Sequence, residues 1–190
     1  MARSYRPGRR ADTQDDTRRR IVDTAIELHQ TIGPAATTFS EIARRAGVGR
    51  VTVYRHFPDE ASLASACSGH YFDLHPAPAP SAWESIADPV KRLRTALTDI
   101  YRYHRETEAM IANALADSRD QPVMAPYLAH WNQVADALTV PFAARGRRRM
   151  LLRAAIGLAV AFDTWRSLVR DQGLDDEQAV EVALRLVADA

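Results

Sequence analysis

The fold of this chain is decided by residues 38–59, which read TFSEIARRAGVGRVTVYRHFPD. Thr38 is followed three residues later by Glu41, a spacing typical of a capping box, in which two side chains satisfy backbone amides at the start of a helix. Gly47 ends that helix, because glycine adopts the left-handed backbone conformation that closes many helices. The stretch therefore opens with a short helix whose two ends are marked.

A second short helix follows almost at once. Gly49 is an acceptable N-cap and Pro58 forbids continuation, so the sequence predicts a helix over residues 50–56. Val53 and Phe57 lie four residues apart and are expected to face inward. Two short helices joined by a tight turn that contains glycine are typical of a helix-turn-helix. The alternative, a generic helical hairpin, does not account for the agreement of cap, turn and aromatic spacing.

The rest of the sequence also favours helices. Apolar residues recur at intervals of three and four, and almost nothing alternates with period two. A first helix is expected over residues 16–31, stopped by Gly33-Pro34, and Asp59 caps another that extends to about His75. Later helices are predicted over residues 89–104, 106–118, 123–144, 147–172 and 175–188. The predicted fold is therefore all-α.

Composition and charge exclude several classes of protein. With 46% hydrophobic and 26% charged residues, the chain can bury a core, which excludes a disordered or collagen-like protein. The lone Cys67 cannot form an internal disulfide, and no run approaches the roughly 18 apolar residues of a membrane span. We expect a cytoplasmic protein with no membrane partner, because the first ten residues lack the apolar stretch of a signal peptide.

The charge is divided unevenly along the chain. Up to Phe57, 11 arginines against six acidic residues leave a charge of +5, whereas the remainder, with 14 basic and 18 acidic residues, carries −4. This split is expected when a small N-terminal unit approaches a polyanion and a larger unit has another task.

Residues 38–59, with the helix before them, resemble the DNA-binding signature of TetR-type transcriptional regulators, and the resemblance extends over residues 17–66. It implies a three-helix DNA-binding domain, a helical domain for ligand binding and dimerisation, and double-stranded operator DNA as a partner. Three residues depart from the family pattern. Gly49 replaces a frequent serine, Val51 replaces a common glycine, and Glu60 stands where many relatives have a phosphate-binding lysine.

Candidate DNA-binding residues follow from how a helix enters a major groove, since it presents its N-terminal residues and one face to bases and phosphates. Arg50 and Arg55 are suited to guanine edges or the backbone, and Val51 to a thymine methyl group. The resemblance implies phosphate contacts for Thr52 and Tyr54. The full set is Thr38, Gly49, Arg50, Val51, Thr52, Tyr54, Arg55 and His56.

The predicted domain order has three parts. A basic N-terminal arm occupies residues 1–15, the helix-turn-helix domain residues 16–60, and the helical ligand-binding and dimerisation domain residues 61–190, with helix 59–75 linking the two domains. The arm carries Arg3, Arg6, Arg9 and Arg10, which either follow the DNA backbone or minor groove or belong to a solvated tail.

Polar and aromatic residues embedded in apolar helices are the candidate ligand-binding residues, because pockets are mostly apolar with a few directing polar groups. Asp163 stands out, since a carboxylate amid apolar residues is costly unless something satisfies it, although Arg166 three residues later is a local partner. The set is Tyr101, His104, Met110, Asn113, Tyr127, His130, Trp131, Phe162, Asp163, Trp165 and Arg166. Each of the aromatic residues is equally compatible with an ordinary core position.

The segment from Leu151 to Val169 is hydrophobic nearly all round and rich in small residues, so it must be buried on more than one side. The resemblance implies that the last two long helices form a homodimer interface. It also implies a repressor that a small, largely apolar effector releases from its operator. A second hypothesis is a DNA-binding dimer without a small-molecule ligand, controlled by a protein partner or by abundance.

A third hypothesis, an unrelated helical enzyme, finds little support. Cys67 and His70 are three residues apart but lack a third catalytic member, and no glycine-rich phosphate loop is present. His70 and His75, with Asp73 between them, lack the spacing of four residues that a helical zinc site uses. We therefore expect no catalytic residue, no metal site and no cofactor.

Overall fold

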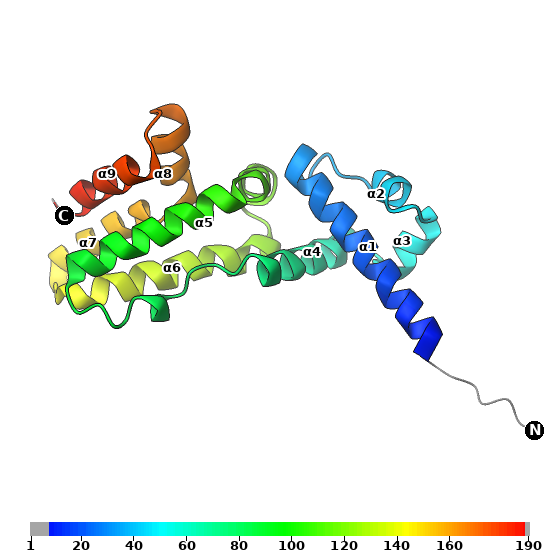
Figure 1. Cartoon of the computed structure of the whole chain (residues 1–190), viewed down its shortest axis with the longest axis horizontal. Coiled ribbons are helices and arrows are strands. Elements are labelled where there is room, and N and C mark those ends of the chain that lie inside the picture. The colour runs from blue at the N-terminus through cyan, green and yellow to red at the C-terminus, as the bar shows by residue number, and fades with distance from the viewer. Residues whose placement is uncertain (1–7, 189–190) are drawn as a thin grey trace, which may run out of the picture. The chain divides into compact units, whose positions relative to one another are not determined.

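The computed structural model describes residues 8–188 and, from residue 14 onward, their side chains. Every regular element within this range is helical, which confirms the predicted all-α fold (Figure 1). The α-helices are α1 (Gly8–Ile32), α2 (Phe39–Ala46), α3 (Arg50–His56), α4 (Glu60–Leu74), α5 (Pro89–Ser118), α6 (Ala125–Thr139), α7 (Gly146–Ala159), α8 (Phe162–Arg166) and α9 (Asp176–Ala188). Short 3₁₀ turns form η1 (Pro80–Ala82), η2 (Pro122–Met124) and η3 (Val140–Phe142), and a π-helical turn forms η4 (Ser167–Asp171).

The beginning of α1 differs from the prediction. The helix begins at Gly8 rather than near residue 16, because neither glycine nor proline interrupts residues 9–31. The predicted arm of residues 1–15 is therefore helical from Gly8. Arg3 and Arg6 lie outside the described residues, and so do the side chains of Arg9 and Arg10.

Two later boundaries also differ. The chain from Pro89 to Ser118 is one continuous helix, α5, where two helices had been expected, because the sequence places no breaking residue near position 105. Helix α6 ends at Thr139 rather than near residue 144, since Pro141 has no amide hydrogen for a helical bond and the chain turns into η3.

The prediction of one helix over residues 147–172 is wrong, because the chain breaks between α7 and α8. The Tyr101 hydroxyl donates to the carbonyl of Ala159 at 2.9 Å, and His104 Nε2 lies 3.0 Å from the carbonyl of Val160. A carbonyl only accepts, so this histidine nitrogen carries the proton. Both side chains are buried, and they satisfy carbonyls at the point where α7 ends.

The residues divide into two compact units. The first consists of the chain up to His75 together with Ala109–Met124, and the second of Pro76–Glu108 together with the chain from Ala125 onward. This division differs from the predicted boundary after residue 60. It assigns α4 and the last turns of α5 to the unit that carries the helix-turn-helix.

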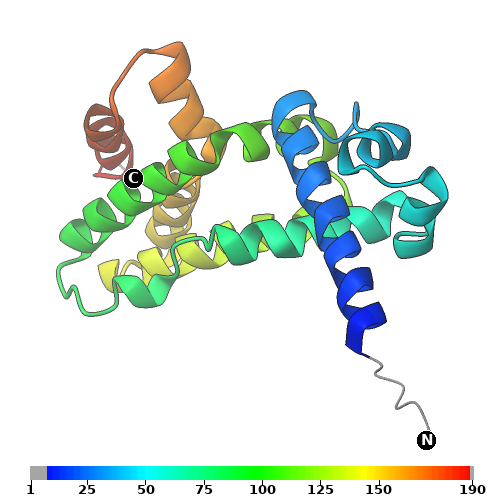
Figure 2. The same cartoon turned by 45° about the vertical axis from the view of Figure 1, so that its right-hand side comes forward.

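In the first unit, α1 packs on α2 and α4, and α2 packs on α3 (Figure 1). Figure 2 shows α1 crossing α4. Ile21 and Leu28 of α1 are fully buried, as are Ile42 of α2 and Val53 of α3. These side chains belong to one hydrophobic core that fixes α3 relative to α1 and α4.

The core of the second unit is rich in aromatic residues. The His104 ring lies at its centre, with ring centroids between 4.9 and 6.3 Å away in Tyr101, Tyr103, Trp131, Phe162 and Trp165. At the edge of the core, Arg105 of α5 forms two hydrogen bonds of 2.7 Å with Asp176 of α9. Helix α7 packs on both α6 and α9.

Candidate nucleic-acid interface

The turn between α2 and α3 has the geometry that the sequence indicates. Thr38 Oγ1 accepts a hydrogen bond from the Glu41 amide at 3.2 Å, and Gly47 adopts φ +64°, the left-handed conformation that ends α2. Gly49 is the N-cap of α3 and the helix ends at His56, as predicted. These backbone features set the direction in which α3 leaves the turn.

The predicted capping box at Thr38 is only half formed. The carboxylate of Glu41 does not reach back to the cap but binds Arg44 and Arg45, each at 2.7 Å. Hydrogen bonds from Arg44 and then Arg45 lower the pKa of Glu41 to about 2, so it is a carboxylate at any physiological pH. The full box occurs instead at the start of α4, between Asp59 and Ser62.

Helix α3 separates a buried face from an exposed one. Val53 is fully buried and Phe57 just beyond the helix is 1% exposed, which confirms that both face inward. Thr38, Gly49, Arg50, Val51, Tyr54 and Arg55 are exposed, and Thr52 and His56 are half-buried. Six of the eight predicted DNA-binding residues thus lie on open surface.

The exposed face of α3 is braced by aromatic contacts. The ring of Tyr54 lies 4.9 Å from that of Phe39 on α2, and the guanidinium of Arg50 lies 5.5 Å from the Tyr54 ring centroid. On the other side, the guanidinium of Arg18 in α1 lies 4.9 Å from the ring of Phe57. Neither Phe39 nor Arg18 is predicted from the sequence as part of the site, because both act through contacts between helices.

The arginines of this surface differ in whether an acidic residue neutralises their charge. Arg44 and Arg45 share Glu41, whereas Arg50 and Arg55 form no ion pair with any residue that the structure describes. Arg50 donates a hydrogen bond to the Tyr54 hydroxyl at 3.4 Å, but no carboxylate neutralises either guanidinium, so both can bind an anion such as phosphate. The pKa of His56 is lowered by burial and then by Arg55 and Arg18, which favours its neutral form.

The predicted ligand-binding residues fall into three groups. Tyr101, His104, Tyr127, Trp131, Phe162 and Trp165 are buried in the core of the second unit, and His130 is half-buried with its ring 3.1 Å from the carbonyl of Pro78. Asn113 belongs to the first unit, where its amide donates to the carbonyls of His29 and Gln30. Asp163 and Arg166 are exposed, so the inference that Asp163 is a buried carboxylate is wrong.

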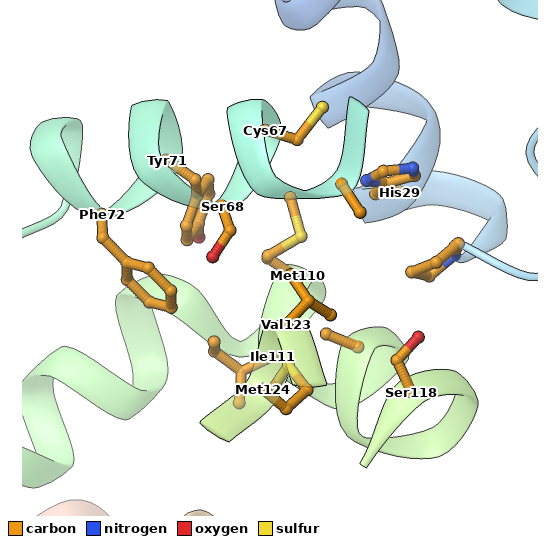
Figure 3. Close-up of a pocket in the computed structure, with 13 residues that line it drawn as sticks. His29, Cys67, Ser68, Tyr71, Phe72, Met110, Ile111, Ser118, Val123 and Met124 are labelled. Atoms are coloured by element: carbon orange, nitrogen blue, oxygen red, sulfur yellow. The ribbon is translucent and has the colours of Figure 1, made fainter. Parts of the chain in front are cut away.

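A pocket with a volume of about 80 Å³ lies within the first unit (Figure 3). Its walls come from α4, the last turns of α5, η2, and the end of α1 at His29 with the adjacent Pro34. Met110 is the one predicted ligand-binding residue that lines it. A sequence signal existed, because Ala64, Ser68 and Phe72 recur at intervals of four and so share one face of α4.

The residues considered for catalysis or metal binding have other partners. The Cys67 thiol is buried 3.9 Å from the carbonyl of Val22, and burial raises its pKa to about 12, which opposes thiolate formation. His70 Nε2 lies 3.0 Å from a carboxylate oxygen of Asp23. Between residues 14 and 188, no three histidine, cysteine, aspartate or glutamate side chains gather as metal ligands would.

No described helix is both long and apolar enough to cross a membrane.

These features define a helix-turn-helix protein: α2 is capped, a left-handed glycine forms the turn, and α3 is cationic on its exposed face and buried on its inner face. Residues 21–67 match the family described as bacterial regulatory proteins, tetR family. Residues 21–67 therefore form a DNA-binding domain of the TetR type.

Curated relatives match mainly this N-terminal region. An HTH-type transcriptional regulator of Mycobacterium tuberculosis is 45% identical over 60 residues, which cover 31% of this chain and 32% of the relative. TtgR of Pseudomonas putida is 31% identical over 94 residues, 49% of this chain and 45% of TtgR. The matched segments span less than half the length of either relative.

Solved structures extend the likeness of fold over most of the chain. A TetR-like transcriptional regulator from Rhodococcus sp. RHA1 aligns with a TM-score of 0.65 at 16% identity, covering 90% of this chain and 93% of that one. AibR in complex with isovaleryl coenzyme A and operator DNA aligns with a TM-score of 0.63 at 20% identity, covering 90% and 97%. At these identities the likeness establishes the fold.

Proposed function

We propose that this protein is a sequence-specific DNA-binding transcriptional regulator that represses by covering its operator. The observation that carries the proposal is the outward face of α3, where Arg50 and Arg55 are exposed and form no ion pair within the described residues, while Val53 is buried on the inner face of the helix. Such a helix fits a major groove, with arginine available to guanine edges and to phosphates. The basic charge of the chain up to Phe57 favours the approach to DNA.

The protein acts as a homodimer in this proposal. Leu151 and Leu158 lie two turns apart on α7 and are 43% and 56% exposed, and Leu186 on the neighbouring α9 is 49% exposed. Exposed apolar side chains are a cost in water that a second copy of the chain removes. Val180 and Ala183 of α9 are already buried within the unit.

A small, largely apolar effector releases the dimer from DNA in this proposal. The complex of AibR with isovaleryl coenzyme A and operator DNA supports an effector for a protein of this fold. The effector shifts the population toward a spacing of the two recognition helices that does not match successive major grooves. The alternative is a DNA-binding dimer without a small-molecule ligand, controlled by a protein partner or by abundance.

The first experiment measures binding to duplex DNA that the protein itself enriches from a random-sequence pool. Arg55→Ala should lower affinity for the enriched sequence by about 1 to 3 kcal/mol if the arginine contacts a base. Tyr54→Phe keeps the ring on Phe39 and removes the hydroxyl together with its hydrogen bond from Arg50, and loss of a phosphate contact there should weaken all sequences about equally. Arg149→Ala removes an exposed charge from α7 and serves as the control of equal charge.

Wild-type affinity in both α3 variants would overturn the assignment of α3 as the recognition helix. A second experiment adds isovaleryl coenzyme A and free isovalerate to the preformed protein–DNA complex. Release by either compound supports control by a small molecule. Retention of DNA at saturating amounts of both favours the alternative in which a protein partner or abundance exerts the control.

A further inference from the structure

The turn from α6 into α7 in the second unit carries a concentration of positive charge that no acidic residue neutralises (Figure 1). The nearest acidic residue in sequence, Asp136, is bound to Arg153, and residues 137–162 contain no aspartate or glutamate. Four exposed arginines at the beginning of α7 form no ion pair and no side-chain hydrogen bond between residues 14 and 188: Arg145, Arg147, Arg148 and Arg149. We call residues 140–150 the cationic tip.

These charges act against the local stability of α7. The first turn of the helix holds no acidic residue, although acidic side chains are favoured at that end of a helix and cationic ones are not. Arg145 and Arg149 are four residues apart, a spacing at which like charges repel each other. Local rules that are broken without compensation inside the chain are expected at functional surfaces. An anionic partner would remove the repulsion.

Exposed apolar side chains lie in the same turn. Val140 in η3 is 66% exposed, and Met150 in α7 is 63% exposed. The tip is held to the core of its unit on both sides, because Thr139 before it and Leu152 after it are buried. It therefore presents aliphatic side chains and cations together from a fixed position.

The arginines surround the end of α7 and do not line one side of it. Successive residues of an α-helix are about 100° apart, so the side chains of Arg147, Arg148 and Arg149 spread over about 200°. An acidic peptide or a DNA duplex that passes on one side would meet only part of this set. A planar anionic surface that meets the helix end-on can contact all of it, and the interior of a lipid bilayer also accepts Val140 and Met150.

We propose that the cationic tip docks the protein on anionic lipid bilayers, with its arginines on the phosphate headgroups and with Val140 and Met150 among the outer acyl carbons. Guanidinium groups bind phosphate oxygens in pairs, and a basic cluster beside apolar side chains supplies the two signals that stable peripheral attachment needs. The sequence indicated no membrane partner because no segment can span a bilayer, a criterion that does not apply to docking at the surface. This docking does not depend on DNA binding.

The first test measures sedimentation of the full-length protein with vesicles of phosphatidylglycerol and phosphatidylcholine in equal parts, and with vesicles of phosphatidylcholine alone. The wild type should bind the anionic vesicles, and less tightly as the salt concentration is raised. Arg147→Gln/Arg148→Gln should weaken this binding at least about tenfold, because each arginine near an anionic surface contributes about fivefold. Equal sedimentation with both kinds of vesicle, or none with either, would overturn the proposal.

The matched control removes the same charge from the helix-turn-helix. Arg50→Gln/Arg55→Gln takes two exposed arginines without ion pairs from α3 and should bind the vesicles as the wild type does. A loss in this variant that equals or exceeds the loss in the tip variant would assign the binding to α3 and overturn the proposal. Circular dichroism checks folding, and Arg145→Gln/Arg149→Gln is a second tip variant that keeps the test decisive if the first is unstable.

The second test asks whether the apolar side chains of the tip enter the bilayer. The three native tryptophans are buried, so Met150→Trp adds an exposed fluorophore to the tip. On anionic vesicles its emission should shift to shorter wavelength and be quenched by brominated phosphatidylcholine. Val51→Trp, at a position on α3 that is 81% exposed, is the control for a protein that meets the vesicle with its helix-turn-helix. Unless Met150→Trp is quenched more than Val51→Trp, the proposal is wrong.

An acidic protein partner is the competing explanation of the same charges, and polyglutamate is the probe for it. If the wild type binds polyglutamate through the tip arginines and does not bind the anionic vesicles, the tip is a protein-docking surface and the membrane proposal fails. Affinity for enriched duplex DNA is measured separately. Failure to bind DNA would contradict the proposed function alone, whereas the vesicle measurements still decide the role of the tip.

Discussion

His104 should make the stability of the protein depend on pH between 4 and 7. The imidazole is fully buried, its Nε2 donates to the Val160 carbonyl, and its Nδ1 has no hydrogen-bond partner among the described residues. Protonation would place an unpaired N–H and a charge in an aromatic core. Burial therefore lowers the pKa of His104 to about 4 from 6.5, although the hydrogen bond to Val160 and the carboxylate of Asp163 oppose the shift.

The sign of the effect follows from proton uptake. Between pH 6.5 and pH 4 the unfolded chain binds a proton at this site and the folded chain does not, so stability is full at pH 7.5 and falls as the pH is lowered. The loss is about 2 kcal/mol at pH 5 and about 3 kcal/mol once the pH is below 4. These values are a large fraction of the stability of an ordinary domain.

The measurement is urea denaturation of the wild type and of His104→Gln at pH 7.5, 6 and 5. Glutamine keeps a donor for the Val160 carbonyl but cannot titrate, so it should be less sensitive to acid by about 2 kcal/mol. The pKa values of His29 and His56 are also lowered, mainly by burial, but their contributions are the same in both proteins and cancel. An equal loss of stability in the two proteins between pH 7.5 and 5 would refute the argument.

Three further predictions concern the turn, the cap and the dimer. Gly47→Ala should cost about 1 to 2 kcal/mol through backbone strain alone, because an added Cβ meets nothing within 4 Å. Gly33→Ala should cost more in the same denaturation assay, since its Cβ would lie 2.6 Å from Asp117 Oδ2, and moving that oxygen would break its hydrogen bond from the Ala35 amide; equal losses would contradict this ranking. Thr38→Ala should cost about 1 kcal/mol by removing the α2 cap, and an unchanged midpoint in urea would argue against the cap. Leu158→Arg should give a folded monomer in sedimentation equilibrium, whereas Ala159→Arg, at a position only 1% exposed, should lose helical signal in circular dichroism; a folded Leu158→Arg dimer would exclude this face as the subunit contact.

The helix-turn-helix could be predicted to the residue because its signals are local. Gly47, Gly49 and Pro58 act through the backbone conformation of their own positions, so the bounds of α2 and α3 do not depend on the rest of the chain. The break after Ala159 is different. No glycine or proline marks it, and it coincides with bonds from Tyr101 and His104, which are more than 50 residues away.

The candidate binding sites show the same limit. The exposed residues of α3 were predicted because one helix determines which way its own residues face. The pocket was missed because its walls come from segments that are distant in sequence, and Asp163 was misplaced because an apolar neighbourhood in sequence does not establish burial. Contacts between helices determine both where the pocket lies and whether Asp163 is buried.

The continuous α5 has a consequence for how this protein can be recombined with its relatives. Its first two-thirds belong to one compact unit and its last turns to the other, so the DNA-binding unit is assembled from two separate stretches of the gene product. Consider a hybrid that takes only residues 1–75 from one regulator and the rest from another. Positions 113 and 117 would then come from the other protein, and the hydrogen bonds that they make with His29, Gln30 and Ala35 would be lost. An exchange of operator specificity between two regulators must therefore include residues 109–124 as well. The segment that has to be exchanged is larger than the sequence motif by which the DNA-binding domain is identified.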